Sequence, residues 1–289
     1  MSAKRILIIG CGKIGLRVAQ LLSRHHQVWG LSRSAPKEHN SPSANLNFIS
    51  ADVSKPELLE DKLPENLDYL IYCVAPTGRN EAAYKKVYLE GMQNIISALK
   101  DASTLQRLYF ISSTSVYHQN DHTFVDEQSP AIPNSFSGRI LLETEDYCRR
   151  ISAPSTIIRF SGIYGASRSR LIDQVKDNQA KLGRDSRLTN RIHEDDCVGF
   201  IFHLIQQDIL GIPNEPIYLA SDSEPVALND VIKFIASHLG VEHTLAPSDD
   251  AEKRRAGNKK CSNKAMLKSG YRLQYPSYRE GYLAMLALL

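Results

Sequence analysis

A short glycine-rich turn near the start of the chain limits its possible folds more than any other feature. Residues 5–9 (RILII) form the continuous apolar run that is typical of a strand buried on both faces of a parallel sheet. Residues 10–15 (GCGKIG) follow directly, and a helical apolar repeat begins inside this segment. Strand, glycine turn and helix thus occur in the order that a dinucleotide-binding sheet requires.

Each glycine of this turn has a separate expected role. Gly10 permits the tight turn, Gly12 lets the backbone approach a pyrophosphate, and Gly15 lets the helix pack on the strand. The start of the helix then offers free N–H groups and the positive end of its dipole. We therefore predict that the phosphates are bound by Gly10, Gly12, Lys13, Ile14 and Gly15.

The end of the next predicted strand indicates which dinucleotide is bound. NAD sites usually place an acidic residue about 20 residues beyond the glycines, where it binds the ribose 2′-hydroxyl. No acidic residue occurs between Gly12 and Lys37, and Ser32 and Arg33 occupy that place. A hydroxyl beside a guanidinium suits the 2′-phosphate of NADP. The sequence favours NADP, and NAD stays open if Arg33 is an ordinary solvated residue.

Strand and helix patterns alternate through the first half of the chain. Predicted strands cover residues 27–33, 46–50, 67–74 and 105–113, with a long helix over about 80–100. This alternation predicts an α/β fold with a doubly wound parallel sheet of the Rossmann type.

Ligands of such sheets bind at the C-terminal ends of the strands. Asp52 and Val53 follow the third predicted strand, and Ala75 and Pro76 follow the fourth, so we expect all four beside the adenosine. For Asp52 two interpretations stay open, because its carboxylate could accept from the adenine amino group or cap the following turn.

Four longer motifs follow one another along the chain, FISSTSVY at 110–117, VDEQSPAIP at 125–133, IIRFSGIYG at 157–165 and NRIHEDDC at 190–197. Their order resembles the extended short-chain dehydrogenase/reductase family, the NAD-dependent epimerases and dehydratases of nucleotide sugars. The resemblance implies a dinucleotide-binding domain over residues 1–158. Residues 159–289 would then form mostly a smaller C-terminal substrate lobe, with a return to the first domain around 190–207.

The resemblance fails at the family's proton-transfer residues. In the family a serine polarises the substrate oxygen, and a tyrosine exchanges the proton with the help of a lysine one helical turn later. Ser113 matches the serine. In residues 135–143 (SFSGRILLE) Gly138 keeps its place, so that Ser137 replaces the tyrosine and Leu141 the lysine. The sequence contains no Tyr-x-x-x-Lys elsewhere.

Another proton donor is therefore needed if the chain is an enzyme. The candidates are Ser113 as a hydrogen-bond donor and His118, because imidazole is a common general acid and base in enzymes. Two function classes stay open. The first is an NAD(P)-binding oxidoreductase or epimerase-like enzyme, and the second is a catalytically inactive sensor of NADP(H).

Residues 166–191 carry seven basic and three acidic side chains. The resemblance places this segment at the substrate's nucleotide, and guanidinium groups suit diphosphates. Arg168 and Arg184 are therefore candidate binding residues for a small anionic substrate or effector, for instance a nucleotide-sugar-like compound. The alternative is a solvated basic helix face.

Composition excludes several other classes. A net charge of +3 is too small for a nucleic-acid-binding face, and no run approaches the ~18 apolar residues of a membrane span. Five dispersed cysteines indicate neither disulfides nor a metal site, so we expect a cytoplasmic protein without a metal. The resemblance also implies a homodimer packed through residues 80–100 and 138–150, with candidate apolar positions at Val87, Met92 and Ile95.

Overall fold

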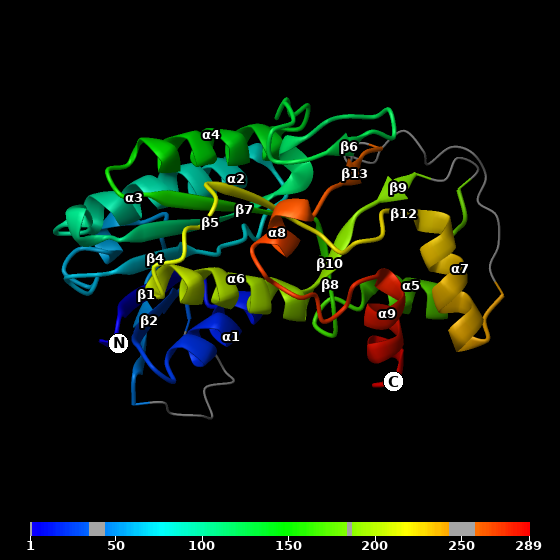
Figure 1. Cartoon of the computed structure of the whole chain (residues 1–289), viewed down its shortest axis with the longest axis horizontal. Helices are drawn as coiled ribbons and strands as arrows, with labels where there is room; N and C mark the ends of the chain where they lie inside the picture. The colour runs from blue at the N-terminus through cyan, green and yellow to red at the C-terminus, as the bar shows by residue number, and fades with distance from the viewer. Residues whose placement is uncertain (1, 35–43, 184–186, 243–257) are drawn as a thin grey trace. The chain divides into compact units, whose positions relative to one another are not determined.

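The computed structural model describes residues 2–34, 44–183, 187–242 and 258–289. Two compact units are present, and Figure 1 shows their elements coloured along the chain. The first unit consists of Met1–Val116, Pro133–Arg159 and Val198–Tyr218, and the second of Tyr117–Ile132, Phe160–Cys197 and Leu219–Leu289.

A seven-stranded parallel sheet is the centre of the first unit. Its spatial order is β11-β7-β5-β4-β1-β2-β3, which confirms the doubly wound α/β fold. The chain adds strands in one direction from β1 to β3 and then in the other direction from β4, so the topology reverses between β1 and β4. The strands are β1 (Arg5–Ile9), β2 (Gln27–Ser32), β3 (Leu46–Ser50), β4 (Tyr69–Tyr72), β5 (Arg107–Ser113), β7 (Ser155–Phe160) and β11 (Ile217–Ala220).

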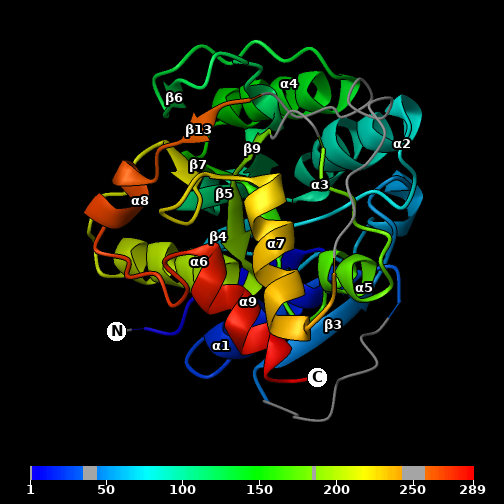
Figure 2. The ribbon, with the colours of Figure 1, turned by 90° about the vertical axis from the view of Figure 1, so that its right-hand side faces the viewer.

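Helices cover both faces of this sheet (Figures 1 and 2). One face carries α1 (Lys13–Leu22) and α6 (Glu194–Ile209). The other carries α2 (Glu81–Lys85), the π-helical turn η2 (Lys86–Glu90), α3 (Gly91–Ala98) and α4 (Phe136–Arg150). Short 3-10 turns are η1 (Pro56–Leu58), η3 (Ala102–Thr104) and η4 (Thr114–Val116).

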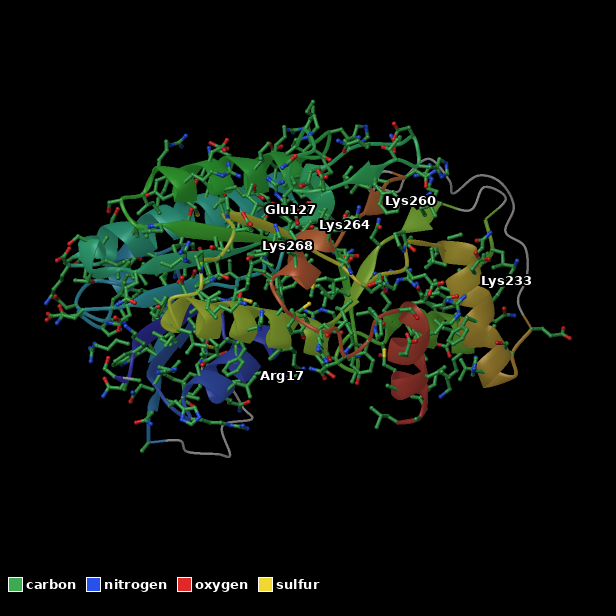
Figure 3. All side chains as sticks on the ribbon, in the orientation of Figure 1. Arg17, Glu127, Lys233, Lys260, Lys264 and Lys268 are labelled. Atoms are coloured by element: carbon green, nitrogen blue, oxygen red, sulfur yellow. The ribbon has the colours of Figure 1, made fainter. Side chains whose placement is uncertain are left out.

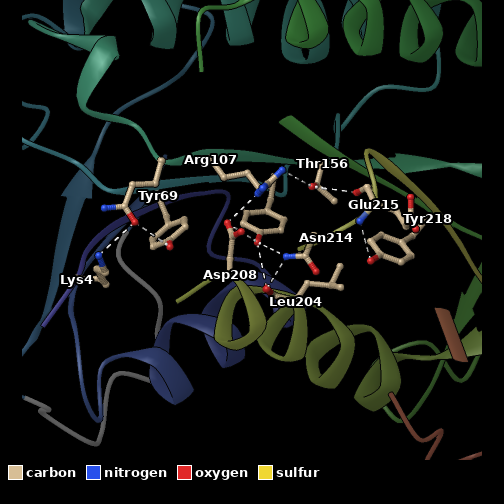
Figure 4. Close-up of polar contacts among 11 residues, drawn as sticks. Lys4, Tyr69, Arg107, Thr156, Leu204, Asp208, Asn214, Glu215 and Tyr218 are labelled. Carbon is tan, nitrogen blue, oxygen red and sulfur yellow. Dashed lines mark hydrogen bonds and ion pairs between the residues drawn. The ribbon is translucent and has the colours of Figure 1, made fainter. Parts of the chain in front are cut away.

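Burial on both faces explains the apolar strands. Ile6, Leu7, Ile8 and Ile9 of β1 all have no exposed surface, as a central strand between two helical layers requires. Figure 4 shows how α6 is held against β5. Arg107 of β5 donates to Asp208 at 2.8 Å.

Two of the three apolar positions expected at a dimer interface have no exposed surface. Met92 and Ile95 on α3 are completely buried within their own unit, so the expectation that they face a second copy is wrong. The helical repeat of apolar residues at these two positions therefore reflects burial inside the chain's own fold. Val87 remains half-buried, and its carbonyl oxygen accepts from the Tyr72 hydroxyl at 2.6 Å.

The second unit contains short strand pairs and small helices. Parallel pairs join β8 to β10 and β6 to β13, and an antiparallel pair joins β9 to β12. The strands are β6 (Phe124–Val125), β8 (Gly162–Tyr164), β9 (Leu188–Thr189), β10 (Arg191–His193), β12 (Val226–Ala227) and β13 (Lys260–Cys261). The helices are α5 (Arg170–Lys176), α7 (Leu228–Leu239), α8 (Lys264–Lys268) and α9 (Tyr278–Leu286), and the core includes Val231, Ile235 and Tyr282.

A buried ion pair anchors α4 to the sheet of the first unit. Glu145 is completely buried and accepts two hydrogen bonds from Arg159 of β7, at 3.0 and 2.5 Å. The Ser112 hydroxyl of β5 donates to the same carboxylate at 2.6 Å, and Arg149 donates at 3.0 Å. Because its lone pairs are all engaged, this carboxylate can remain charged in the interior.

We expect Glu145→Ala to lower the unfolding free energy by about 3 kcal/mol or more, because it leaves the Arg159 guanidinium buried without a carboxylate. Glu143→Ala, at an exposed position of the same helix, is the control and should change it by less than about 0.5 kcal/mol. Urea denaturation of both variants measures the difference. Equal urea midpoints for the two variants would show that the Glu145–Arg159 ion pair does not stabilise the packing of α4 on the sheet.

Candidate functional site

Two glycines of the turn are required by the local fold. Gly10 has a φ of +97°, and a Cβ there would lie 2.3 Å from the carbonyl oxygen of Cys73. A Cβ at Gly15 would lie 2.1 Å from the carbonyl oxygen of Gly10. Any larger residue at these two positions would push apart α1, the turn and the end of β4.

Gly12 has no such structural requirement. Its φ of −77° suits any residue, and a Cβ there would find no heavy atom of the described residues within 4 Å. Glycine at this position is therefore explained by something other than the packing of the chain. The open space in front of it fits the pyrophosphate that the turn predicts.

The first turn of α1 also fits an anion. Within the described part of the chain this turn has no side-chain cap and no acidic residue, whereas Ser135 caps α4 and Ser277 caps α9. The glycine that precedes α1 offers no side-chain acceptor to the first N–H groups of the helix. Lys13 is exposed at the first helical position, and Ile14 is buried behind it.

The end of β2 presents one strong phosphate-binding group. Arg33 is exposed directly after the strand, and its carbonyl oxygen accepts from Ser50 at 3.2 Å. The Ser32 hydroxyl donates to the carbonyl oxygen of Ser34 at 2.7 Å. Because this bond uses the only hydroxyl proton of Ser32, the Arg33 guanidinium is the better donor to a 2′-phosphate.

Asp52 makes the turn-capping bonds that the sequence left as one of its two interpretations. One carboxylate oxygen accepts from the Ser54 N–H at 3.0 Å and from the Ser54 hydroxyl at 2.8 Å. Burial acts to raise the pKa of Asp52, but these bonds and the nearby Arg33 charge outweigh it and lower the pKa. The carboxylate is thus held ionised, and binding to adenine stays a prediction for its other oxygen.

The other predicted adenosine neighbours occupy different environments. Val53 is buried against α3, where a Cβ on Gly91 would lie 2.8 Å from its side chain. Ala75 is exposed and Pro76 half-buried in the segment after β4. These two follow the strand at which the topology reverses, where ligands of such sheets bind.

Ser113 ends β5 and lies close to the first turn of α4. Its hydroxyl oxygen accepts from the Ser115 N–H at 3.2 Å. A Cβ on Gly138 would lie 2.4 Å from the Ser115 carbonyl oxygen, so helix and turn are in direct contact. Glycine at position 138 is required for this approach.

Ser137 and Leu141 of α4 are the positions at which the sequence predicts replacements of the family's proton-transfer pair. The Ser137 hydroxyl is 3.1 Å from that of Ser135, and Leu141 is buried. A serine hydroxyl is a much weaker acid than a phenol, and a leucine supplies no positive charge. These two positions cannot transfer a proton as the usual pair does.

His118 belongs to the second unit, whereas Ser113 belongs to the first. The neighbouring Tyr117 is buried, and its hydroxyl donates to the carbonyl oxygen of Asp126 at 2.7 Å. The tyrosine is thus part of the loop's internal structure. A joint role of Ser113 and His118 stays a prediction.

Of the two arginines predicted to bind substrate, only Arg168 lies in the described part of the chain. Arg168 lies 3.2 Å from Glu194, whose carboxylate also accepts from the N–H and hydroxyl of Ser167. This pairing offsets part of the positive charge expected at Arg168. Arg184 lies outside the described residues.

Two buried carboxylates in the second unit were not predicted. Asp196 is completely buried and accepts from the Tyr271 hydroxyl and from the N–H groups of Gln274 and Tyr275. Burial raises the pKa of Asp222 to about 7, and the Arg191 charge opposes this shift. Sequence spacing could not reveal either site, because Asp196 bonds to residues 75 to 79 positions away and Arg191 is 31 positions from Asp222.

The fold and the glycine turn together define a dinucleotide-binding α/β protein. Residues 6–215 match the NAD dependent epimerase/dehydratase family, and the chain belongs to this family. This finding confirms the resemblance seen in the sequence.

Similar proteins cover most or all of the chain. A structure of a putative NAD-dependent epimerase/dehydratase from Methylobacillus flagellatus is 39% identical, with a TM-score of 0.82 and 99% of each chain covered. Protein YeeZ of Escherichia coli K12 is 29% identical over 70% of this chain and 73% of its own length. The human epimerase family protein SDR39U1, solved with NADPH, shares the fold at 18% identity and a TM-score of 0.78, covering 99% of this chain and all of its own.

A membrane-spanning helix and a metal-binding cluster are both absent from the described residues. None of their helices is both long and apolar enough to cross a bilayer. No three of their His, Cys, Asp or Glu side chains are grouped as a metal site would require.

Proposed function

We propose that this chain binds NADP(H) at the glycine turn and uses it as an oxidoreductase or epimerase-like enzyme on a small anionic, nucleotide-sugar-like substrate. The observation that carries the cofactor assignment is the contrast among the three glycines. Gly10 and Gly15 are required by packing, whereas a Cβ at Gly12 would have no heavy atom of the described residues within 4 Å. A glycine that the fold does not need is explained by a ligand that approaches the backbone closely.

Arg33 supports NADP rather than NAD. It is exposed beside the end of β2, at the place where an NAD site would have an acidic residue. The bound nicotinamide would supply or accept hydride. The chain's own residues would bind the phosphates, orient the substrate oxygen through Ser113 and supply the proton from a group other than a Tyr–Lys pair.

Gly12→Ala tests the cofactor site without disturbing the fold. We expect a melting temperature close to that of the wild type, because the added Cβ contacts none of the described residues. We expect NADPH affinity, measured by calorimetry, to fall at least about tenfold, because the methyl group occupies the space of the pyrophosphate. Unchanged affinity in this variant would refute the assignment.

Arg33→Ala tests the choice of dinucleotide. Loss of a charge-assisted bond to the 2′-phosphate should weaken NADPH binding about tenfold or more and leave NADH binding nearly unchanged. Arg24→Ala removes the same charge from an exposed position just after α1 and serves as the control. An equal effect of both variants on NADPH would indicate only a general electrostatic contribution.

The second candidate function is a sensor that binds NADP(H) without turnover. The apolar, buried Leu141 at the expected lysine position favours it, because a leucine side chain carries no charge that could support proton transfer. Loss of reduced-nicotinamide absorbance with UDP-linked keto-sugars decides between the two functions. We expect turnover that falls at least about a hundredfold in Ser113→Ala. Tight NADPH binding without turnover on any such sugar would favour the sensor.

A further inference from the structure

Lys259 is an ammonium group buried inside the second unit. The side chain is 4% exposed. Its segment is held firmly, because β13 pairs with β6 and the Asn190 side chain bonds to both the Lys259 carbonyl and the Cys261 N–H. Lys260, labelled in Figure 3, begins β13 directly after Lys259 and is only half-buried.

The charge of Lys259 is poorly compensated. Its Nζ donates to the carbonyl oxygen of Tyr117 at 3.1 Å, and no carboxylate of the described residues forms an ion pair with it. Burial lowers the pKa of this amine, and the Cys261 thiol only partly opposes the effect. Two of the three ammonium protons therefore have no acceptor among the described residues.

Packing alone does not explain a lysine at this position. A methionine of similar length would fill the space without the cost of an unpaired buried charge. A single hydrogen bond to a backbone carbonyl is also within the capacity of a neutral amide. Retaining the positive charge is useful if a negative charge arrives there during function.

Gln119, two residues after Tyr117, is a second polar side chain whose hydrogen bonds are only partly satisfied by the described residues. Gln119 donates through its amide nitrogen to the Pro130 carbonyl oxygen at 2.9 Å. Its amide oxygen is buried and has no hydrogen-bond partner among the described residues. The Lys259 ammonium, bonded to Tyr117, can still donate, and the Gln119 amide oxygen can still accept. Such a pair suits a ligand that has an oxyanion for the lysine and a hydroxyl group for the glutamine.

We propose that Lys259 binds the oxyanion of the substrate and is the main positive charge with which the second unit recognises it. The inference rests on the proposed function, because it concerns the anionic substrate assigned there. It replaces Arg168 and Arg184 with the buried Lys259 as the determinant of charge specificity.

Lys259→Met, with Lys260→Met as the matched control, tests this proposal by calorimetry in saturating NADPH. UDP supplies phosphate oxygens and malonate supplies carboxylates, so the two titrations distinguish the sources of the oxyanion. We expect one of the two to bind the wild type and Lys260→Met equally, and to bind Lys259→Met at least about tenfold more weakly. NADPH binding should be the same in all three proteins, because the glycine turn belongs to the first unit.

Melting temperatures provide an independent readout. Without added anion, Lys259→Met should melt at or above the wild-type temperature, because an unpaired charge has been removed. A purely structural lysine would give a lower temperature, and this result would overturn the proposal. Lys259→Gln, which can still donate to the Tyr117 carbonyl oxygen, is titrated beside Lys259→Met and should lose anion affinity to the same extent.

Two other results would also overturn the inference. One is unchanged anion affinity in the Lys259 variant, and the other is no binding of UDP or malonate to the wild type. Failure of the proposed function is recognised separately, as an absence of NADPH binding in every protein tested.

Discussion

The contact between α1 and the turn that follows β1 is the constraint on which the candidate site depends. Gly15 packs so closely on the Gly10 carbonyl that no side chain fits between them. This contact aims the start of α1 at the edge where the strand order reverses. There Gly12 precedes the helix without a side chain to cap it, and a Cβ at Gly12 would have no heavy atom of the described residues within 4 Å. Tight packing behind the turn thus creates an open anion-binding surface in front of it.

The fold was predictable because its signals are local. The apolar run of β1, the glycine spacing and the helical repeat of α1 lie within 18 residues, and short-range sterics determine each of them. The error at Met92 and Ile95 has a related cause. A helical repeat shows which face is apolar, but not whether the cover is the chain's own sheet or a second copy.

The polar interior of the second unit was much harder to predict. Asp196 bonds to residues 271–275, and Lys259 bonds to Tyr117, which is 142 positions earlier. No periodicity relates such partners, and one sequence alone cannot show that a lysine is buried. Asp52 shows an intermediate case, because its bonds to Ser54 are local and the turn-capping alternative was visible in the sequence.

The π-helical turn η2 has a consequence for the helix that crosses one face of the sheet. Its i→i+5 bonding accommodates an additional residue per turn and rotates α2 relative to α3 about the common axis. Tyr84 of α2 meets Phe136 at the start of α4, with ring centroids 5.4 Å apart, and Met92 of α3 is completely buried. A single-residue deletion within 86–90 would restore the ordinary helical period and detach these two aromatic rings from each other.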